Sequence, residues 1–441
     1  MNIENFLHQG TEKLKESDPT LFDLLQLEHQ RQNDSLWLVA SASMSTPSIL
    51  ASSAMSIGNI TTDGYPGSRY LPGCEFADRI EELAIDRAKN IFHAEHANLQ
   101  PHSGTSANQS LLFRLLKQGE TFMGMDLKAG GHLTHGAKAS ILGTYFNSQT
   151  YGVNEQGWID YDLVRDLAKK VRPRLIIAGA SAYPRLIDYK LFRTIADEVG
   201  AYLLADISHL SGLIAAEELP NPINDAHFCT SSTYKQICGP KGGMILLGKD
   251  GLDRAQGEKI SLIESVDIGV APLFQDTPSL AAITAKANAF NFIATDDYKN
   301  IARSILSSAS VMADELISRG YHLQTGGTDN HMILLDLRPQ GLTGLVAEQA
   351  LEKCNIIANR NPIPFDPYPP YISAGIRFGS NILALRNLDR DTAIQVVNLI
   401  DTVLSNTKPI DQKEFNLPSD IIESVRAEVK EICDDFPVAG Y

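Results

Sequence analysis

Short apolar runs of strand length alternate with helical stretches through the middle of the chain. The runs lie at 175–180, 202–205, 227–230 and 244–247, and a helical pattern at 189–199 follows the first. Strands of a parallel sheet are continuous apolar runs because helices bury both of their faces. The alternation therefore predicts an α/β fold, built on a mostly parallel sheet with helices on both faces.

The length of the chain predicts more than one domain, because 441 residues exceed the roughly 250–300 at which a single core stops growing. After a helical stretch at about 279–319 the pattern changes to a compact α+β type. We expect an N-terminal helical arm at 1–50, a large α/β domain at 51–295 and a small C-terminal α+β domain at 296–441. Apolar residues among the charges of the arm suit packing against another chain.

Charge and composition exclude several classes of protein. The formal net charge is −15 at pH 7, whereas a nucleic-acid partner would need a basic stripe. No run approaches the ~18 apolar residues of a membrane span, and no signal-peptide core precedes Asp18. The five cysteines form no CxxC pair and no HExxH motif occurs, so we expect reduced thiols and no metal site. The chain is predicted to be cytoplasmic, without nucleic-acid or membrane partners.

Two charged residues follow neighbouring apolar runs. Asp206 ends the run at 202–205, and Lys235 follows the next run inside a Ser/Thr-rich segment. Open α/β sheets bind ligands at the carboxyl ends of their strands, so both side chains are predicted at one ligand-binding edge. An aspartate at such an edge is often structural. A lysine beside it is unusual enough to need a chemical reason.

A serine acyl-enzyme is one interpretation of this lysine, because Ser232-Thr233-Tyr234-Lys235 fits the S-x-x-K pattern. That chemistry also requires S-D-N and K-T-G strings, and neither occurs in the chain. The acyl-enzyme interpretation is therefore disfavoured.

Pyridoxal phosphate is the interpretation that uses all of these residues. It needs an amine for an imine, an anion beside its ring nitrogen and donors for its phosphate. Ser103, Gly104 and Thr105 form a small-residue turn that opens a helix and can present backbone N–H groups to a phosphate. An ordinary helix N-cap would also explain this turn when it is taken alone.

The chain resembles the serine hydroxymethyltransferase family of fold-type I pyridoxal-phosphate enzymes over nearly its whole length. The stretches that carry the resemblance are DGYPGSRYLPGCE at 63–75, LAIDRAKNIF at 83–92, QPHSGTSAN at 100–108, GGHLTHG at 130–136, SAY at 181–183, ADISHLSGLIAA at 205–216, TYKQICGPKGG at 233–243 and SAGIRFGS at 373–380. The resemblance implies an aminotransferase-like fold and pyridoxal phosphate as cofactor.

The resemblance also implies roles for individual residues. Lys235 would carry the cofactor as a Schiff base, Asp206 would hold its ring nitrogen, and His132 would stack on its ring. Arg377 would bind the substrate carboxylate through two hydrogen bonds, and Ser41 would assist it. The remaining implied residues are Asp63 and Tyr70 in catalysis and Ser103, Gly104, Thr105, Ser181, His209 and Ser232 around the cofactor. His135 and Tyr183 favour core roles.

Several positions depart from the family pattern. Asp63 stands where the family has a catalytic glutamate, and Tyr234 replaces the histidine before the lysine. Asp276-Thr277 takes the place of a glycine pair that binds the phosphate of the partner subunit. The other departures are Thr61 and Leu71 for tyrosines, Ala42 for a glutamate and Phe365 for an asparagine that contacts folate.

The expected activity is to make or break the Cα–Cβ bond of a small β-hydroxy amino acid such as serine or threonine, with glycine as the other amino acid. One hypothesis is hydroxymethyl transfer with tetrahydrofolate as cosubstrate. A second is folate-independent threonine aldolase or transaldolase action on a larger aldehyde, because the changed positions touch the folate. A third is a non-catalytic homologue that acts as a binding partner. The resemblance implies a homodimer or tetramer.

Overall fold

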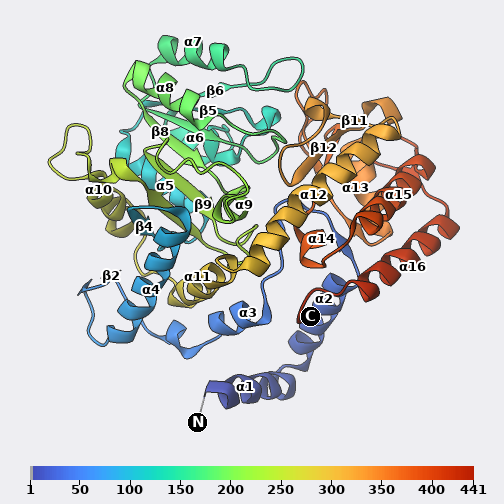
Figure 1. Ribbon diagram of the computed structural model, residues 1–441, viewed down its shortest axis with the longest axis horizontal. Coiled ribbons are helices and arrows are strands. Elements are labelled where there is room, and N and C mark those ends of the chain that lie inside the picture. Colours follow the sequence, from blue (N-terminus) through green and yellow to red (C-terminus); the bar gives the residue numbers. More distant parts are fainter. Residues whose placement is uncertain (1–2) are drawn as a thin grey trace.

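The computed structural model describes residues 3–441, so the first two residues of the predicted arm lie outside it. Helices α1 (Ile3–Ser17) and α2 (Pro19–Asn33) extend from the body of the chain (Figure 1). Neither helix contains a buried residue. Leucines of α2 are instead exposed to solvent: Leu21, Leu24, Leu25 and Leu27. This arm has a surface that the rest of its own chain does not cover.

A seven-stranded sheet forms the centre of the large domain. Its order is β4-β10-β9-β8-β7-β5-β6, and β10 runs antiparallel to both of its neighbours while the other pairs are parallel. The strands are β4 (His96–Asn98), β5 (Thr121–Met125), β6 (Asn147–Tyr151), β7 (Leu175–Gly179), β8 (Tyr202–Asp206), β9 (Phe228–Ser232) and β10 (Gly243–Leu247). The predicted α/β fold with a mostly parallel sheet is confirmed.

Helices cover both faces of this sheet because alternate side chains along each strand point to opposite sides. Leu175 and Ile177 of β7 join a core beneath α5 (Gly104–Leu115) and α10 (Leu262–Ile268). Ile176 and Ala178 join the opposite core. That core is closed by α4 (Glu75–Phe92), α7 (Tyr161–Val171), α8 (Tyr189–Val199) and α11 (Leu280–Ile293).

The small domain is an antiparallel sheet covered by helices. Its strand order is β11-β12-β15-β14, from β11 (His322–Leu323), β12 (Met332–Asp336), β15 (Gly375–Gly379) and β14 (Asn359–Asn361). Helix α13 (Gly344–Lys353) packs on it, α15 (Arg390–Asn406) packs on α13, and α16 (Ser419–Asp435) packs on α15 to complete the same core. Strand β1 (Leu36–Trp37), which follows the arm, pairs with β13 (Ile356–Ile357) and buries Leu36 in this core.

The helical stretch expected at 279–319 is two helices. Helix α11 ends at Ile293, and α12 (Asp296–Ser318) begins after Thr295, whose hydroxyl accepts the Tyr298 N–H at 3.2 Å. This N-cap starts a new helix in a new direction. Figure 1 shows α12 running from the sheet domain to the small domain, and its side chains belong to both cores.

The remaining elements are short. They are α3 (Pro47–Ser53), the hairpin strands β2 (Gly64–Tyr65) and β3 (Ser68–Arg69), α6 (Ile141–Tyr145), α9 (Ser211–Ala215), α14 (Asn381–Leu385), β16 (Lys408–Pro409), β17 (Phe415–Asn416) and several single helical turns. All five cysteines are buried and unpaired. Among residues 3–441 no helix combines the length and the apolar character that crossing a bilayer requires.

One buried arginine joins the arm to the end of the chain. The Arg386 guanidinium donates to the carbonyls of Asn33 at 2.7 Å and Phe436 at 2.9 Å. It makes longer bonds to three further carbonyls, those of Gln32, Ser35 and Cys433. Arg386 therefore links the end of the arm to the end of α16.

Replacing this arginine should destabilise the fold. In Arg386→Met these carbonyls lose a charged donor inside the protein, so we expect the free energy of unfolding to fall by about 3 kcal/mol. Urea unfolding followed by circular dichroism measures this loss. Arg390→Met is the matched control, since Arg390 is exposed, and it should change stability by less than about 0.5 kcal/mol. Equal effects of the two substitutions would contradict the assignment.

Candidate active site

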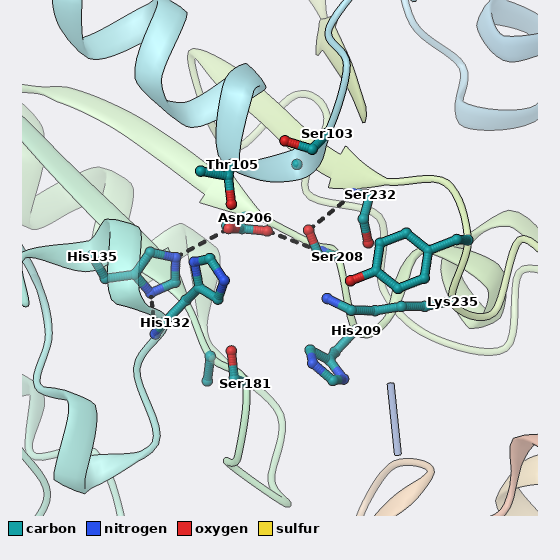
Figure 2. Close-up of a pocket in the computed structure, with 13 residues that line it drawn as sticks. Ser103, Thr105, His132, His135, Ser181, Asp206, Ser208, His209, Ser232 and Lys235 are labelled. Atoms are coloured by element: carbon teal, nitrogen blue, oxygen red, sulfur yellow. Dashed lines mark hydrogen bonds and ion pairs between the residues drawn. The ribbon is translucent and has the colours of Figure 1, made fainter. Parts of the chain in front are cut away.

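A pocket opens where the carboxyl ends of β7, β8 and β9 meet the N-terminus of α5 (Figure 2). This is the edge at which a parallel sheet binds its ligands. The residues that line it are Ser103, Gly104, Thr105, His132, His135, Ala180, Ser181, Asp206, Ser208, His209, Ser232, Tyr234 and Lys235. The structure thus brings together every residue that the sequence placed around the cofactor.

Asp206 lies at the end of β8, and its carboxylate is almost enclosed. It accepts hydrogen bonds from Asn108 Nδ2 at 2.8 Å, His135 Nε2 at 3.0 Å and the Ser208 N–H at 3.1 Å. Burial alone would raise the pKa of Asp206, but the hydrogen bonds that its carboxylate accepts from His135 and Ser208 oppose burial and hold the pKa well below its usual value. The pocket therefore contains a permanent anion.

The two histidines come from the turn after β5. A side chain at Gly130 would meet the Ala182 carbonyl at 2.5 Å, and Gly130 has φ +107°, so the chain can approach the segment after β7 this closely only with glycine here. His135 Nδ1 accepts the His132 N–H at 3.2 Å, which leaves the proton on Nε2 for Asp206. Burial and the neighbouring His135 lower the pKa of His132 to about 4. His132 is thus a neutral ring at the pocket wall.

Lys235 follows β9 and is only 7% exposed. Burial lowers its pKa to about 8; the Asp206 carboxylate opposes this shift, while Arg377 and Lys241 add to it. More of the amine is therefore neutral near neutral pH than in an ordinary lysine, and the neutral amine is the form that attacks an aldehyde.

The N-terminus of α5 and Ser232 form a cradle for an anion. Ser103 caps α5 by accepting the Ser106 N–H at 3.0 Å, and a side chain at Gly104 would meet the Ser232 backbone nitrogen at 3.2 Å. The Ser232 hydroxyl is buried without a hydrogen-bond partner among residues 3–441. A phosphate would supply that partner and accept the free N–H groups of the helix. The residues present therefore fit the phosphate of pyridoxal phosphate.

Arg377 approaches the pocket from β15 of the small domain. Its Nη1 donates to the Ser181 carbonyl and its Nη2 to Asn359 Oδ1 at 3.2 Å. Its Nε is buried without a partner within residues 3–441. Ser41, the other predicted substrate-binding residue, does not line the pocket; its neighbour Ala40 lies against Gly379 at the end of β15. An unpaired guanidinium donor of this kind suits a carboxylate ligand.

The family of the chain follows from a comparison with known protein families. A sequence model of serine hydroxymethyltransferase matches residues 14–400. The chain belongs to the serine hydroxymethyltransferase family. Family members depend on pyridoxal phosphate, and the anion, the amine and the phosphate cradle described above are the groups that this cofactor needs.

Two predicted catalytic residues of this serine hydroxymethyltransferase family member lie outside the pocket. Asp63 and Tyr70 flank the β2–β3 hairpin and line a separate cavity with Gly64, Tyr65, Ser68, Ala271, Pro272 and Asp276. Tyr70 is 77% exposed. One chain alone does not bring these residues to Lys235.

The structure also adds residues that sequence reasoning missed. His135 is buried, as the expected core role requires, and it also donates to Asp206. Asn108 was not singled out, although it follows Gly104 by one helical turn and therefore shares its face of α5. His331 lies against His209, with 3.4 Å between their ring nitrogens Nε2 and Nδ1. Of these, only Asn108 had a sequence signal, namely its spacing from the phosphate turn.

The lowered pKa of Lys235 predicts how the rate of cofactor attachment depends on pH. Only the neutral amine attacks the aldehyde, so the rate of Schiff-base formation with added pyridoxal phosphate should rise with pH and level off above a midpoint near 8. An ordinary lysine would keep gaining rate toward roughly pH 10.4. Stopped-flow absorbance on the apoprotein measures this profile.

A neighbouring charge provides the control for this profile. The Arg377 cation contributes to the lowered pKa of Lys235, so Arg377→Gln should move the midpoint to higher pH. A wild-type rate that still climbs at pH 10, or a midpoint that Arg377→Gln leaves in place, would contradict this account.

Proposed function

We propose that the chain is a homodimeric, cytoplasmic enzyme that makes or breaks the Cα–Cβ bond of a small β-hydroxy amino acid. The observation that carries the proposal is a charged carboxylate, Asp206, in one pocket with Lys235, beside a buried guanidinium with a free donor. That guanidinium belongs to Arg377, which reaches the pocket through its hydrogen bond to the Ser181 carbonyl. A carboxylate ligand bound to Arg377 would present its amino group to the cofactor.

Each residue of the pocket has a part in this chemistry. Pyridoxal phosphate, when bound, supplies a sink for the electron pair that a broken bond leaves on Cα. Asp206 keeps a proton on the ring nitrogen by holding a negative charge beside it. His132 presents a neutral ring face, and Lys235 carries the amine that exchanges with the substrate amine.

A second copy of the chain would complete the site. The hairpin that carries Asp63 and Tyr70 is surrounded by exposed apolar side chains, among them Ile60, Leu71, Phe76 and Leu273. Monomeric proteins rarely leave large apolar patches open to water. We propose that this surface and the arm meet a partner chain, and that Asp63 and Tyr70 then serve the partner's pocket.

Folate-independent aldol chemistry is a second candidate, and the position of Phe365 favours it. Phe365 is 66% exposed and lines a cavity with Trp158, Arg338 and neighbouring residues. A phenyl ring there cannot form the hydrogen bonds of an asparagine amide. Hydroxymethyl transfer with tetrahydrofolate therefore loses one contact that the family resemblance implies. A purely binding homologue is disfavoured because the anion, amine and guanidinium all remain.

An experiment with and without tetrahydrofolate separates hydroxymethyl transfer from folate-independent aldol chemistry. Purified protein is mixed with serine or threonine, with and without tetrahydrofolate, and the amino-acid and aldehyde products are followed by mass spectrometry. We expect glycine to form from threonine at the same rate with and without folate. An absolute folate requirement would favour hydroxymethyl transfer instead.

The control is Lys235→Ala, which keeps the pocket but lacks the amine and should form no glycine. If the wild type matches Lys235→Ala on every substrate, the chain is a binding homologue and the proposed function is wrong.

A further inference from the structure

We propose that Thr277 is a positioning residue that holds the Asp63 carboxylate in place for the Cα–Cβ bond step. The inference rests on the proposed function, since Asp63 has a part only if that bond is made or broken. The Thr277 hydroxyl donates a short hydrogen bond to Asp63 Oδ1. Both residues depart from the family pattern: Asp63 replaces a glutamate, and Thr277 replaces one glycine of a pair.

The backbone of Asp63 is fixed before Thr277 acts. Arg69 Nη1 donates to the carbonyls on either side of Asp63, those of Thr62 at 2.8 Å and Gly64 at 2.6 Å. The Arg69 side chain is 4% exposed and is itself paired with Glu81 at 2.5 Å. Only the two side-chain torsions of Asp63 therefore remain free.

Thr277 removes that remaining freedom. With Oδ1 engaged by the Thr277 hydroxyl, Oδ2 is the oxygen left to accept a proton in the cavity that Asp63 shares with Tyr70. An aspartate is one methylene shorter than the glutamate it replaces, so its reach depends more strongly on a correct rotamer. A glycine at 277 could not supply this hydroxyl.

Thr277 is anchored from the opposite side as well. His102 Nε2 lies 3.2 Å from the Thr277 carbonyl, to which it can donate. Gln275 Nε2 donates to the Gln100 carbonyl at 2.6 Å, and Gln275 Oε1 accepts the His102 N–H at 3.4 Å. His102 immediately precedes Ser103 of the phosphate cradle. The segment at 275–277 therefore ties the Asp63 hairpin to the cofactor turn.

In the proposed reaction Asp63 accepts and returns the proton of the β-hydroxyl group. When the Cα–Cβ bond breaks, its electron pair goes to Cα and the β-hydroxyl becomes the carbonyl of the released aldehyde. The hydroxyl proton passes to Asp63 Oδ2, and it returns along the same path when the bond is made. Exchange of a glycine α-proton with solvent involves no β-hydroxyl, so Thr277 should not affect that reaction.

The test compares these two reactions in Thr277→Val, which keeps the shape of the side chain and removes the hydroxyl. We expect kcat for threonine cleavage to fall about tenfold, because the loss of one hydrogen bond in the transition state slows a reaction by about this factor. KM, cofactor absorbance and the exchange of glycine α-protons in D2O should stay unchanged. Thr277→Ser should restore cleavage to within about threefold. Thr284→Val, a half-buried threonine of α11, is the matched control and should cleave like wild type.

A double-mutant cycle separates positioning from general damage. In an Asp63→Ala background, Thr277→Val should cause no further loss, because the carboxylate that it positions is already absent. Equal losses of cleavage and exchange, or additive losses in the double mutant, would contradict the positioning role of Thr277. They would leave the proposed function intact. A wild-type protein that catalyses neither reaction would overturn the proposed function and this inference together.

Discussion

The site depends on keeping one buried carboxylate charged at the end of β8. Asp206 achieves this with donors from three different segments: Asn108 on α5, His135 in the turn after β5 and the backbone of Ser208 in its own turn. These donors meet because the N-terminus of α5 lies at the sheet edge and the glycine turn brings the histidines to the same pocket. The sheet order, the N-terminus of α5 and the glycine turn therefore act together to place these donors around Asp206.

Much of this arrangement was predictable from local patterns. Apolar runs predicted the buried strands, and because parallel strands end at one edge, Asp206 and Lys235 had to lie near each other. The division of the stretch at 279–319 was missed, since the Thr295 cap acts through one hydrogen bond inside a continuous helical pattern. The role of His135 was missed because its partner is 71 residues away in the sequence, a contact that periodicity does not encode.

Several of the departures from the family pattern lie together at the β2–β3 hairpin, whereas Phe365 and Ala42 lie elsewhere. Lys235 and Asp206 lie in the pocket, whereas Asp63, Leu71 and Thr277 belong to the hairpin surface and its supporting segment. Tyr234 is a departure inside the pocket, where Lys241 Nζ lies over its ring, 3.6 Å from the centroid. Most residues of the Lys235 pocket therefore match the family pattern. The hairpin surface, which we propose meets a partner chain, differs from that pattern at several positions.

The most direct test of the central claim is the nitrogen-15 chemical shift of ring-labelled pyridoxal phosphate bound to the protein. If Asp206 is a permanent anion beside the ring, the ring nitrogen stays protonated at pH 8 in the wild type and becomes neutral in Asp206→Asn. A neutral ring nitrogen in the wild type, or the same shift in both proteins, would contradict the account.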